Sequence, residues 1–258
     1  MTSRLSAITW NTFREAVRDR VLYNLVLFVL LLVASAPLFS QISIGLEKLM
    51  LVNMGLSSIS LFGVIIAIFV GIGLVSKEIE KKTLYTILSR PVRRWEFIAG
   101  KYLGLLLTLA VNTALMTVGF YVALLIFIGG LKGVDAMLLV AVYFIVLQFM
   151  MMVAITLLFS TFSTPIFSAI FAFALYVIGT FGEDLKNFAA MSQGVTKWLA
   201  MGAAYIMPNF ASLNVIAQAA HEQKVGSSLI VSNTVYALLY SLAVTVAAVM
   251  IFERRNLK

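Results

Sequence analysis

Of the 258 residues, 62% are hydrophobic and only 12% are charged, and the mean hydropathy is +1.02. This composition excludes a water-soluble globular protein and indicates an all-α integral membrane protein with little length left for a soluble domain. The absence of cysteine excludes disulfides, thiolate nucleophiles and cysteine-ligated metals, and the net charge of +8 is spread around apolar runs and does not form a basic domain for nucleic acid.

The N-terminal segment, residues 1–18, has the pattern of an amphipathic helix that lies on a membrane surface. Its apolar or small residues share one helical face, and its charged residues lie opposite. The first face comprises Leu5, Ile8, Thr12, Phe13, Ala16 and Val17, and the second comprises Arg4, Asn11, Arg14, Glu15 and Arg18. We expect this helix to contact a partner protein, with contact to lipid alone as the alternative.

Uncharged apolar runs then alternate with short charged connections. A membrane-spanning helix needs roughly 20 apolar residues. The predicted spans are residues 21–39, 55–75, 102–128, 136–160, 165–182 and 229–252. Fourteen of the 19 basic residues fall at the two termini and in the connection between the second and third spans. Because cytoplasmic connections are enriched in Lys and Arg, both termini are predicted to be cytoplasmic in a multi-pass protein of the cell (inner) membrane.

Every Lys, Arg, Asp and Glu, and the single histidine His221, lies outside these six runs. Ion-coupled carriers keep ionisable groups inside the membrane, so an ion-coupled secondary carrier is the less favoured alternative. Neither a nucleophile with its base nor a metal-ligand set can be assembled within the spans, so we do not expect an enzyme or a bound metal. Energy for uphill transport must therefore enter from outside the bilayer.

The connection at residues 77–101 carries seven of the basic residues and is predicted to form two short helices. In the first, Leu84, Ile87 and Leu88 form a narrow apolar stripe. Pro91 ends this helix and can open the next, which leads into the third span as an interfacial elbow. The residues of that elbow that share an apolar face are Trp95, Ile98, Ala99 and Tyr102, with Arg93, Arg94 and Lys101 around it. The simpler alternative is a basic loop that only fixes orientation.

No nucleotide site is expected in this chain. The pair Gly100–Lys101 is reminiscent of a phosphate-binding loop, but Trp95 stands where that loop needs its first glycine and Tyr102 where it needs serine or threonine. On the external side, the apolar stretch 195–207 is too short to span and is stopped by Pro208, which predicts re-entrant or surface helices between the fifth and sixth spans.

Three stretches resemble the permease subunits of type-2 ATP-binding-cassette (ABC) transporters. They are "NTFREAVRDRVLYNLVLF" from Asn11, "KEIEKKTLYTILSRPVRRWEFIAGKYLG" from Lys77 and "YIMPNFASLNV" from Tyr205. The resemblance covers nearly the whole chain, as one domain over 1–258, and is greatest to the branch associated with multicopper enzyme maturation. Lys82 departs from the pattern, since relatives commonly have glycine before the threonine.

The resemblance implies a permease of an ATP-driven exporter that pairs with a second permease, identical or related, and with two cytoplasmic ABC ATPase subunits. ATP and Mg would bind to those subunits, and this chain would bind no cofactor. The residues implied for ATPase coupling are Glu78, Glu80, Thr83, Leu84, Ile87, Leu88, Arg90 and Pro91. Those implied for the interface helix are Phe13, Arg14, Glu15 and Arg18, and those for the external gate are Pro208, Asn209 and Phe210. A non-transporting membrane scaffold or assembly factor remains the other alternative.

Overall fold

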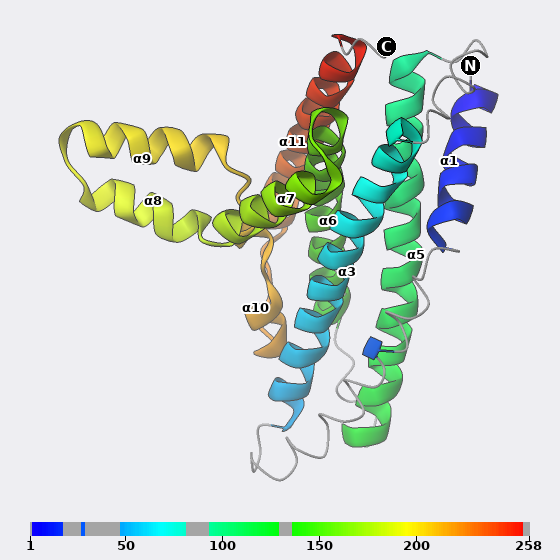
Figure 1. Cartoon of the computed structure of the whole chain (residues 1–258). Helices are drawn as coiled ribbons and strands as arrows, with labels where there is room; N and C mark the ends of the chain where they lie inside the picture. Colours follow the sequence, from blue (N-terminus) through cyan, green and yellow to red (C-terminus); the bar gives the residue numbers. More distant parts are fainter. Residues whose placement is uncertain (1, 18–26, 29–46, 81–92, 129–135, 255–258) are drawn as a thin grey trace.

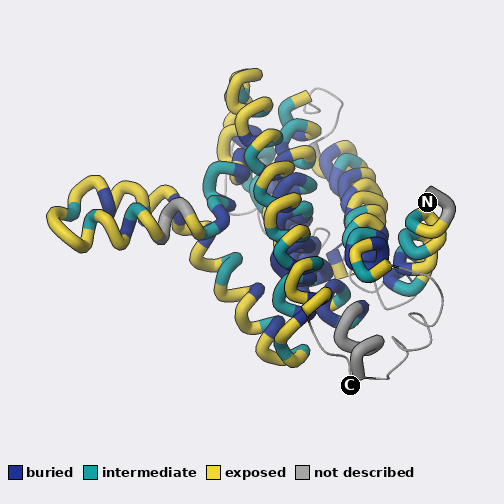
Figure 2. Tube along the Cα trace, turned by 90° about the horizontal axis from the view of Figure 1, so that it is seen from above, coloured by how far each residue is buried: buried dark blue, intermediate teal, exposed yellow. Residues whose placement is uncertain are grey.

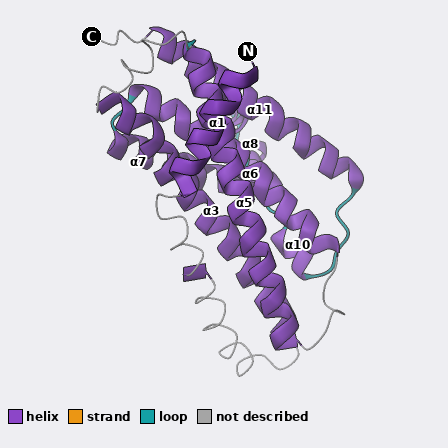
Figure 3. Ribbon diagram, turned by 90° about the vertical axis from the view of Figure 1, so that its right-hand side faces the viewer, coloured by secondary structure: helices purple, strands orange, loops and turns teal. Residues whose placement is uncertain are grey.

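All regular structure in the described part of the chain is helical. The computed structural model describes residues 2–17, 27–28, 47–80, 93–128 and 136–254 (Figure 1). Its elements are α1 (Thr2–Ala16), α3 (Glu47–Glu80), α5 (Arg94–Ile128), α6 (Ala136–Phe162), α7 (Pro165–Thr180), α8 (Gly182–Met191), α9 (Gly194–Ile206), the 3₁₀ turn η3 (Ala211–Leu213), α10 (Ile216–Ala220) and α11 (Ser227–Arg254). Figure 3 shows no strand within these ranges, which confirms the all-α class there.

Four of these helices are long and apolar enough to cross a membrane. The qualifying stretches are Lys48–Leu74, Arg94–Phe127, Ala136–Phe162 and Ser227–Arg254. α6 packs against α3, α5, α7 and α11 and so lies at the centre of the bundle. About two thirds or more of the most apolar part of α3 and α6 is buried, against 22% for α11, because α11 packs mainly on α6 and α5 and lies at the edge of the described bundle.

Four predicted spans coincide with these helices, which extend beyond the apolar runs because polar turns continue them at the ends. The matching predictions are 55–75, 102–128, 136–160 and 229–252. The first predicted span, 21–39, lies outside the described residues except for a helical piece at 27–28, where Phe28 packs edge-on against Phe62. The total of six spans therefore stays a prediction.

The predicted fifth span, 165–182, differs from a straight crossing helix. α7 has 16 residues, or about 24 Å, which is less than the roughly 30 Å of a hydrocarbon core. α8 follows after a bend of 58°, so the two helices together form a broken span or a re-entrant loop.

α8 and α9 form a hairpin that projects sideways from the bundle (Figure 1). We call residues 182–206 the arm. Figure 2 shows the arm mostly in the colour of exposed residues, in contrast to the dark centre of the bundle. The predicted pair of helices before the last span is present as α8 and α9. The position of this pair relative to a membrane stays a prediction.

At the centre of the bundle, aromatic rings of neighbouring helices pack directly against glycines of α3. A Cβ at Gly63 would lie 1.9 Å from Cζ of Phe149 on α6, and one at Gly55 would lie 2.3 Å from Cε2 of Phe120 on α5. At the same α3–α6 contact, Gln148 Nε2 donates to Ser60 Oγ at 3.1 Å. Small residues and such interhelical hydrogen bonds are the usual means by which membrane helices pack closely.

Candidate functional site

α5 begins at Arg94 because a carboxylate satisfies its first turn. Glu96, which is buried, accepts a hydrogen bond from the backbone N–H of Arg93 at 3.0 Å. The first turn of a helix leaves its N–H groups without helical partners, and a negative side chain there also interacts favourably with the helix dipole. α5 then continues to Ile128, so the second predicted short helix of the connection is the start of a long span.

Arg94 joins the start of α5 to the end of α11. Its Nη1 donates to the backbone oxygen of Glu253 at 2.7 Å and to that of Phe252 at 3.2 Å. The last carbonyls of a helix lack helical partners, and a cation is favoured there by the dipole. One guanidinium thus caps α11 from a residue that is 159 positions earlier in the chain.

Apolar contacts reinforce this junction. The rings of Phe97 and Phe252 are stacked, with centroids 5.8 Å apart, and both side chains are buried. Ile98 and Ala248 complete a small buried cluster that is separate from the main core. Trp95, predicted to share the face of Ile98, is instead 37% exposed.

α1 lies along the start of α5 through two glycines. A Cβ at Gly100 would lie 2.5 Å from Cγ2 of Ile8, and one at Gly104 would lie 2.5 Å from Cβ of Thr12 and 2.8 Å from the backbone oxygen of Thr9. Both contacts advance by four residues in the same direction, so the two helices run nearly parallel here (Figures 1 and 3). The spacing G-x-x-x-G is a common motif for close helix packing in membranes.

Lys101, predicted to lie beside the apolar face of an interfacial elbow, is buried within this junction. Its side chain is 2% exposed, and Nζ lies 3.4 Å from Glu15 Oε2 and 5.7 Å from the centre of the Phe97 ring. A buried ammonium group requires such a partner, because removal from water costs several kcal/mol. Glu15, predicted on the polar face of the N-terminal helix, is therefore turned towards α5.

The amphipathic pattern of α1 is otherwise confirmed. Thr12 and Ala16 are buried, Phe13 is half-buried and Arg14 is exposed, with its guanidinium 5.5 Å from the centre of the Trp10 ring. The predicted interface residue Arg18 lies outside the described residues.

The predicted coupling residues fall mostly between α3 and α5. Glu78 and Glu80 belong to the last turn of α3. The others lie outside the described residues, namely Thr83, Leu84, Ile87, Leu88, Arg90 and Pro91. The end of α3 and the start of α5 lie at the end of the bundle that also carries the N-terminus and the end of α11 (Figure 1). The connection therefore joins the bundle at the α1–α5–α11 junction, which we call the junction hereafter.

The external-gate residues are brought together in one buried loop. Phe210 is 1% exposed, its backbone N–H donates to the Gly179 oxygen at 3.0 Å, and its ring lies 5.6 Å from that of Tyr176. A Cβ at Gly179 would lie 2.4 Å from the backbone oxygen of Pro208, so the end of α7 requires glycine there. This loop is thus packed onto α7.

Asn209 ties the same loop to α11. Its backbone N–H donates to the Tyr236 hydroxyl at 2.9 Å, and its side-chain oxygen accepts from the Ser212 N–H at 3.2 Å. Asn233 Nδ2 in turn donates to the Ser212 backbone oxygen at 2.9 Å. The loop therefore fixes the base of the arm between α7 and α11, while its role as a gate stays a prediction.

A family model described as "ABC-2 family transporter protein" matches residues 6–257. The chain belongs to this family. No curated protein matches it. An ABC-2 chain is a membrane component of a transporter, it is not itself the ATPase, and the family implies partnership with ABC ATPase components. The match is to the family as a whole, so the resemblance to the multicopper-maturation branch stays a prediction.

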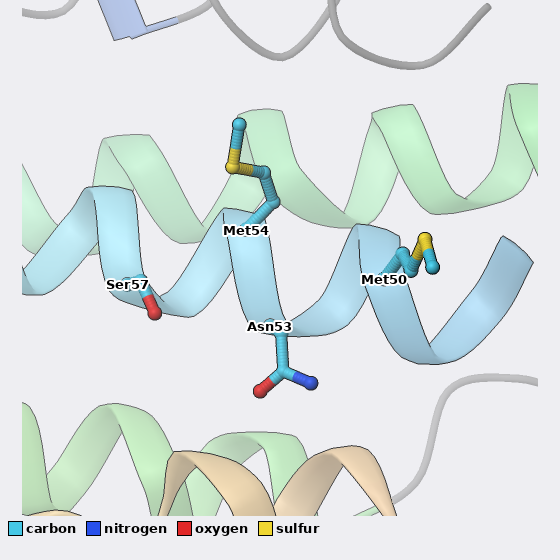
Figure 4. Close-up of a pocket in the computed structure, with 4 residues that line it drawn as sticks. All are labelled: Met50, Asn53, Met54 and Ser57. Atoms are coloured by element: carbon cyan, nitrogen blue, oxygen red, sulfur yellow. The ribbon is translucent and has the colours of Figure 1, made fainter. Parts of the chain in front are cut away.

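A hollow on α3 does not bring polar side chains together as the junction does. An open cavity of about 280 Å³ lies on α3 and is lined by Met50, Asn53, Met54 and Ser57. Figure 4 shows Met54 on one side of the helix and Asn53 with Ser57 on the other, so the four side chains do not converge on one point. Among the described residues, no three His, Cys, Asp or Glu side chains group as metal ligands.

Sequence reasoning missed three elements of this ABC-2 site. The motif Gly100-x-x-x-Gly104 was legible in the sequence, but only its Gly-Lys pair was considered. Arg94 and Tyr236 left no local signal, because each bonds a residue far away in the chain. Such contacts follow from tertiary packing alone.

Proposed function

We propose that this ABC-2 chain is the membrane-spanning permease of an ATP-driven exporter whose cytoplasmic ATPase subunits bind at residues 77–101. Two ATPase subunits would serve two permeases, the second being another copy or a paralogue. The export direction comes from the family resemblance. The observation that carries the proposal is the junction, where the start of α5 is joined to α1 and α11.

The junction gives an ATPase-driven movement a path into the bundle. Displacement of the connection acts first on the start of α5. Packing at Gly100 and Gly104 and the ion pair of Lys101 link that start to α1, and Arg94 links it to α11. Because packed helices move as bodies, a push at one point displaces three helices together.

The distribution of charge supports an external energy source. In the four spanning stretches, charged residues of the described chain occur only near the helix ends: Lys48, Arg94, Glu96, Lys101, Glu253 and Arg254. A carrier driven by an ion gradient needs ionisable groups deeper in the membrane. Transport that persists on a proton gradient after ATP depletion would favour that alternative.

The test asks whether an ATPase is recovered with the chain, and whether that recovery depends on the predicted apolar stripe of Leu84, Ile87 and Leu88. Pull-down of the full chain from its own membranes in mild detergent should recover a P-loop ATPase, and the chain alone should not hydrolyse ATP. The double change Leu84→Asp and Leu88→Asp should weaken the complex, since a buried leucine contributes about 1.5–3 kcal/mol.

Lys81→Gln is the matched control, because one exposed charge contributes below about 1 kcal/mol. Normal complex formation and hydrolysis in the double variant would show that the connection is only a topological anchor. A complex whose hydrolysis rate equals that of the free ATPase would favour a scaffold over a transporter.

A further inference from the structure

The arm is held to the bundle only near its base. α8 and α9 pack mainly on each other, and α8 meets the bundle at α7 and η3. Ala189 and Ala200 are buried between the two helices, while most other described side chains of the arm are exposed (Figure 2). An arm of this kind leaves its outer faces available to something beyond this chain.

The outer face of α9 is an apolar stripe. Val195, Trp198, Leu199 and Ile206 recur at helical spacing and are 70–76% exposed. Gly202 lies in the same stripe, one turn from Trp198 and one turn from Ile206, and a Cβ there would meet nothing within 4 Å. Mid-helix glycine costs helix stability, and Gly100 and Gly104 of this chain are each used for a close contact, whereas a Cβ at Gly202 would meet no atom of the described residues within 4 Å.

The base of the arm lies well along α11 and not at its end. The Tyr236 hydroxyl that holds Asn209 belongs to a residue nine positions from Ser227, or about 14 Å along the helix. α11 is about 42 Å long and exceeds the hydrocarbon core by about 12 Å. Figure 1 likewise shows the arm leaving the side of the bundle between its two ends. With α11 across the bilayer, the arm lies at or inside the outer edge of the hydrocarbon.

The charges of the arm do not suit lipid at that depth. Glu183, Asp184 and Lys186 are exposed and Lys197 is half-buried. Charged groups in the hydrocarbon region are costly unless protein or water surrounds them. The two signs are present in equal number, which suits a contact between two identical surfaces, where each acid can meet a base of the other copy. An anionic lipid surface would instead favour an excess of positive charge.

We propose that the arm docks onto a second copy of this chain, with the α9 stripe around Gly202 at the contact. This inference rests on the proposed function, because it assigns the surface through which two permeases meet. Gly202 admits close approach of a partner helix, and Trp198 and Leu199 supply apolar area beside it. Across the two-fold axis, the two acids of α8 pair with Lys186 of α8 and Lys197 of α9 from the other copy.

The first experiment places a photo-crosslinking amino acid at Trp198 of the full chain in native membranes. The expected product is a covalent pair of chains at twice the chain mass. Adducts only with lipid would mean that the arm faces the bilayer, and adducts only with a different protein would identify another occupant; either result would overturn the proposal.

The second experiment compares Gly202→Leu with Gly202→Ala in the purified chain, measured by mass photometry in lipid nanodiscs and detergent. A Cβ at Gly202 would meet no described atom within 4 Å, so both variants should fold. Leucine should raise the dimer dissociation constant by about tenfold or more through overpacking at the contact, and alanine should change it less.

An unchanged dissociation constant in the leucine variant would contradict the proposal. Dimers that persist without a Trp198 crosslink would mean that two permeases meet through another surface, which leaves the proposed function intact. Loss of ATPase recovery from a chain that still dimerises through the arm would instead remove the proposed function alone.

Discussion

The start of α5 and the arm differ in how many contacts hold them to the rest of the chain. The first eleven residues of α5, 94–104, are fixed by a cap, an ion pair, an aromatic stack and two glycine contacts. Among the described residues, the main contacts between the arm and the bundle lie at its base, where α8 packs on α7 and η3 beside the hydrogen-bonded loop around Asn209.

The two regions also differ in the surroundings of their charged residues and glycines. At the junction, Lys101 is buried with a partner and Gly104 is filled by a neighbouring helix. On the arm, three of the four charged residues are exposed, and a Cβ at Gly202 would meet no described atom within 4 Å. The junction is thus completed within one chain, and the arm is not.

The largest effect is expected from adding a side chain at the junction. In Gly104→Leu, a Cβ would lie 2.5 Å from Thr12 Cβ and 2.8 Å from the Thr9 backbone oxygen, which cannot move as a side chain can. We expect a loss of about 3 kcal/mol in the free energy of unfolding, and release of α1 from α5. Thermal unfolding in detergent and protease cleavage within α1 measure these changes.

Gly202→Leu is the matched control on the arm, since its Cβ meets nothing within the chain. The free energy of unfolding of the monomeric variant should stay within about 0.5 kcal/mol of the original. Equal destabilisation by the two leucines would remove the contrast between the regions.

The two residues of the Lys101–Glu15 ion pair should differ in how much stability is lost when each is replaced. Glu15→Gln leaves the buried ammonium of Lys101 without that carboxylate, and we expect a loss of about 1–2 kcal/mol, because Glu15 itself is 38% exposed. Lys101→Met should be nearly neutral, since an apolar side chain fills the same space and Glu15 can turn to water. Urea unfolding of both variants measures the difference, and a more harmful Lys101→Met would contradict this account of the burial.

Arg94 should stabilise the end of α11 more than the whole fold. Arg94→Ala removes both hydrogen bonds to the carbonyls of Phe252 and Glu253, which we expect to cost about 1–2 kcal/mol. Amide hydrogen exchange should become faster in the last turns of α11. Arg93→Ala is the control, because Arg93 takes part through its backbone N–H alone, and equally fast exchange in that variant would argue against capping by Arg94.

The smallest effect is expected at the base of the arm. Tyr236→Phe removes the hydroxyl that accepts from the Asn209 N–H, at an expected cost of about 1 kcal/mol. Asn233 still holds Ser212, so the loop should loosen without detaching. Exchange rates of the amides at 209–212 measure this, and full protection in the variant would show that the hydroxyl is dispensable.

The spans were largely predictable because the bilayer demands long uncharged runs. The run 136–160 became Ala136–Phe162, and 229–252 became Ser227–Arg254. Helix ends were less predictable. α5 starts eight residues before its predicted span, because Glu96 caps the helix and its first two turns include polar residues. The bend after α7 also escaped prediction, since hydropathy does not record direction.

The site was predictable only where its chemistry is local. The amphipathic pattern of α1 located its buried face at Thr12 and Ala16. The burial of Lys101 could not be foreseen, because it depends on the turn of α1 that brings Glu15 near. The grouping of Pro208, Asn209 and Phe210 came from resemblance, and the partners that hold them, Tyr236 and Gly179, come from distant helices.

The central claim is that α1, the start of α5 and the end of α11 move as one body when ATP binds to the partner. Spin labels at Trp10 and Glu253, both exposed, report the distance across the junction, and a label at Lys224 marks the other end of the bundle. Double electron–electron resonance on the complex, with and without trapped ATP, should give an unchanged Trp10–Glu253 distance and a changed distance from each to Lys224. A Trp10–Glu253 distance that changes as much as the other two would contradict the account.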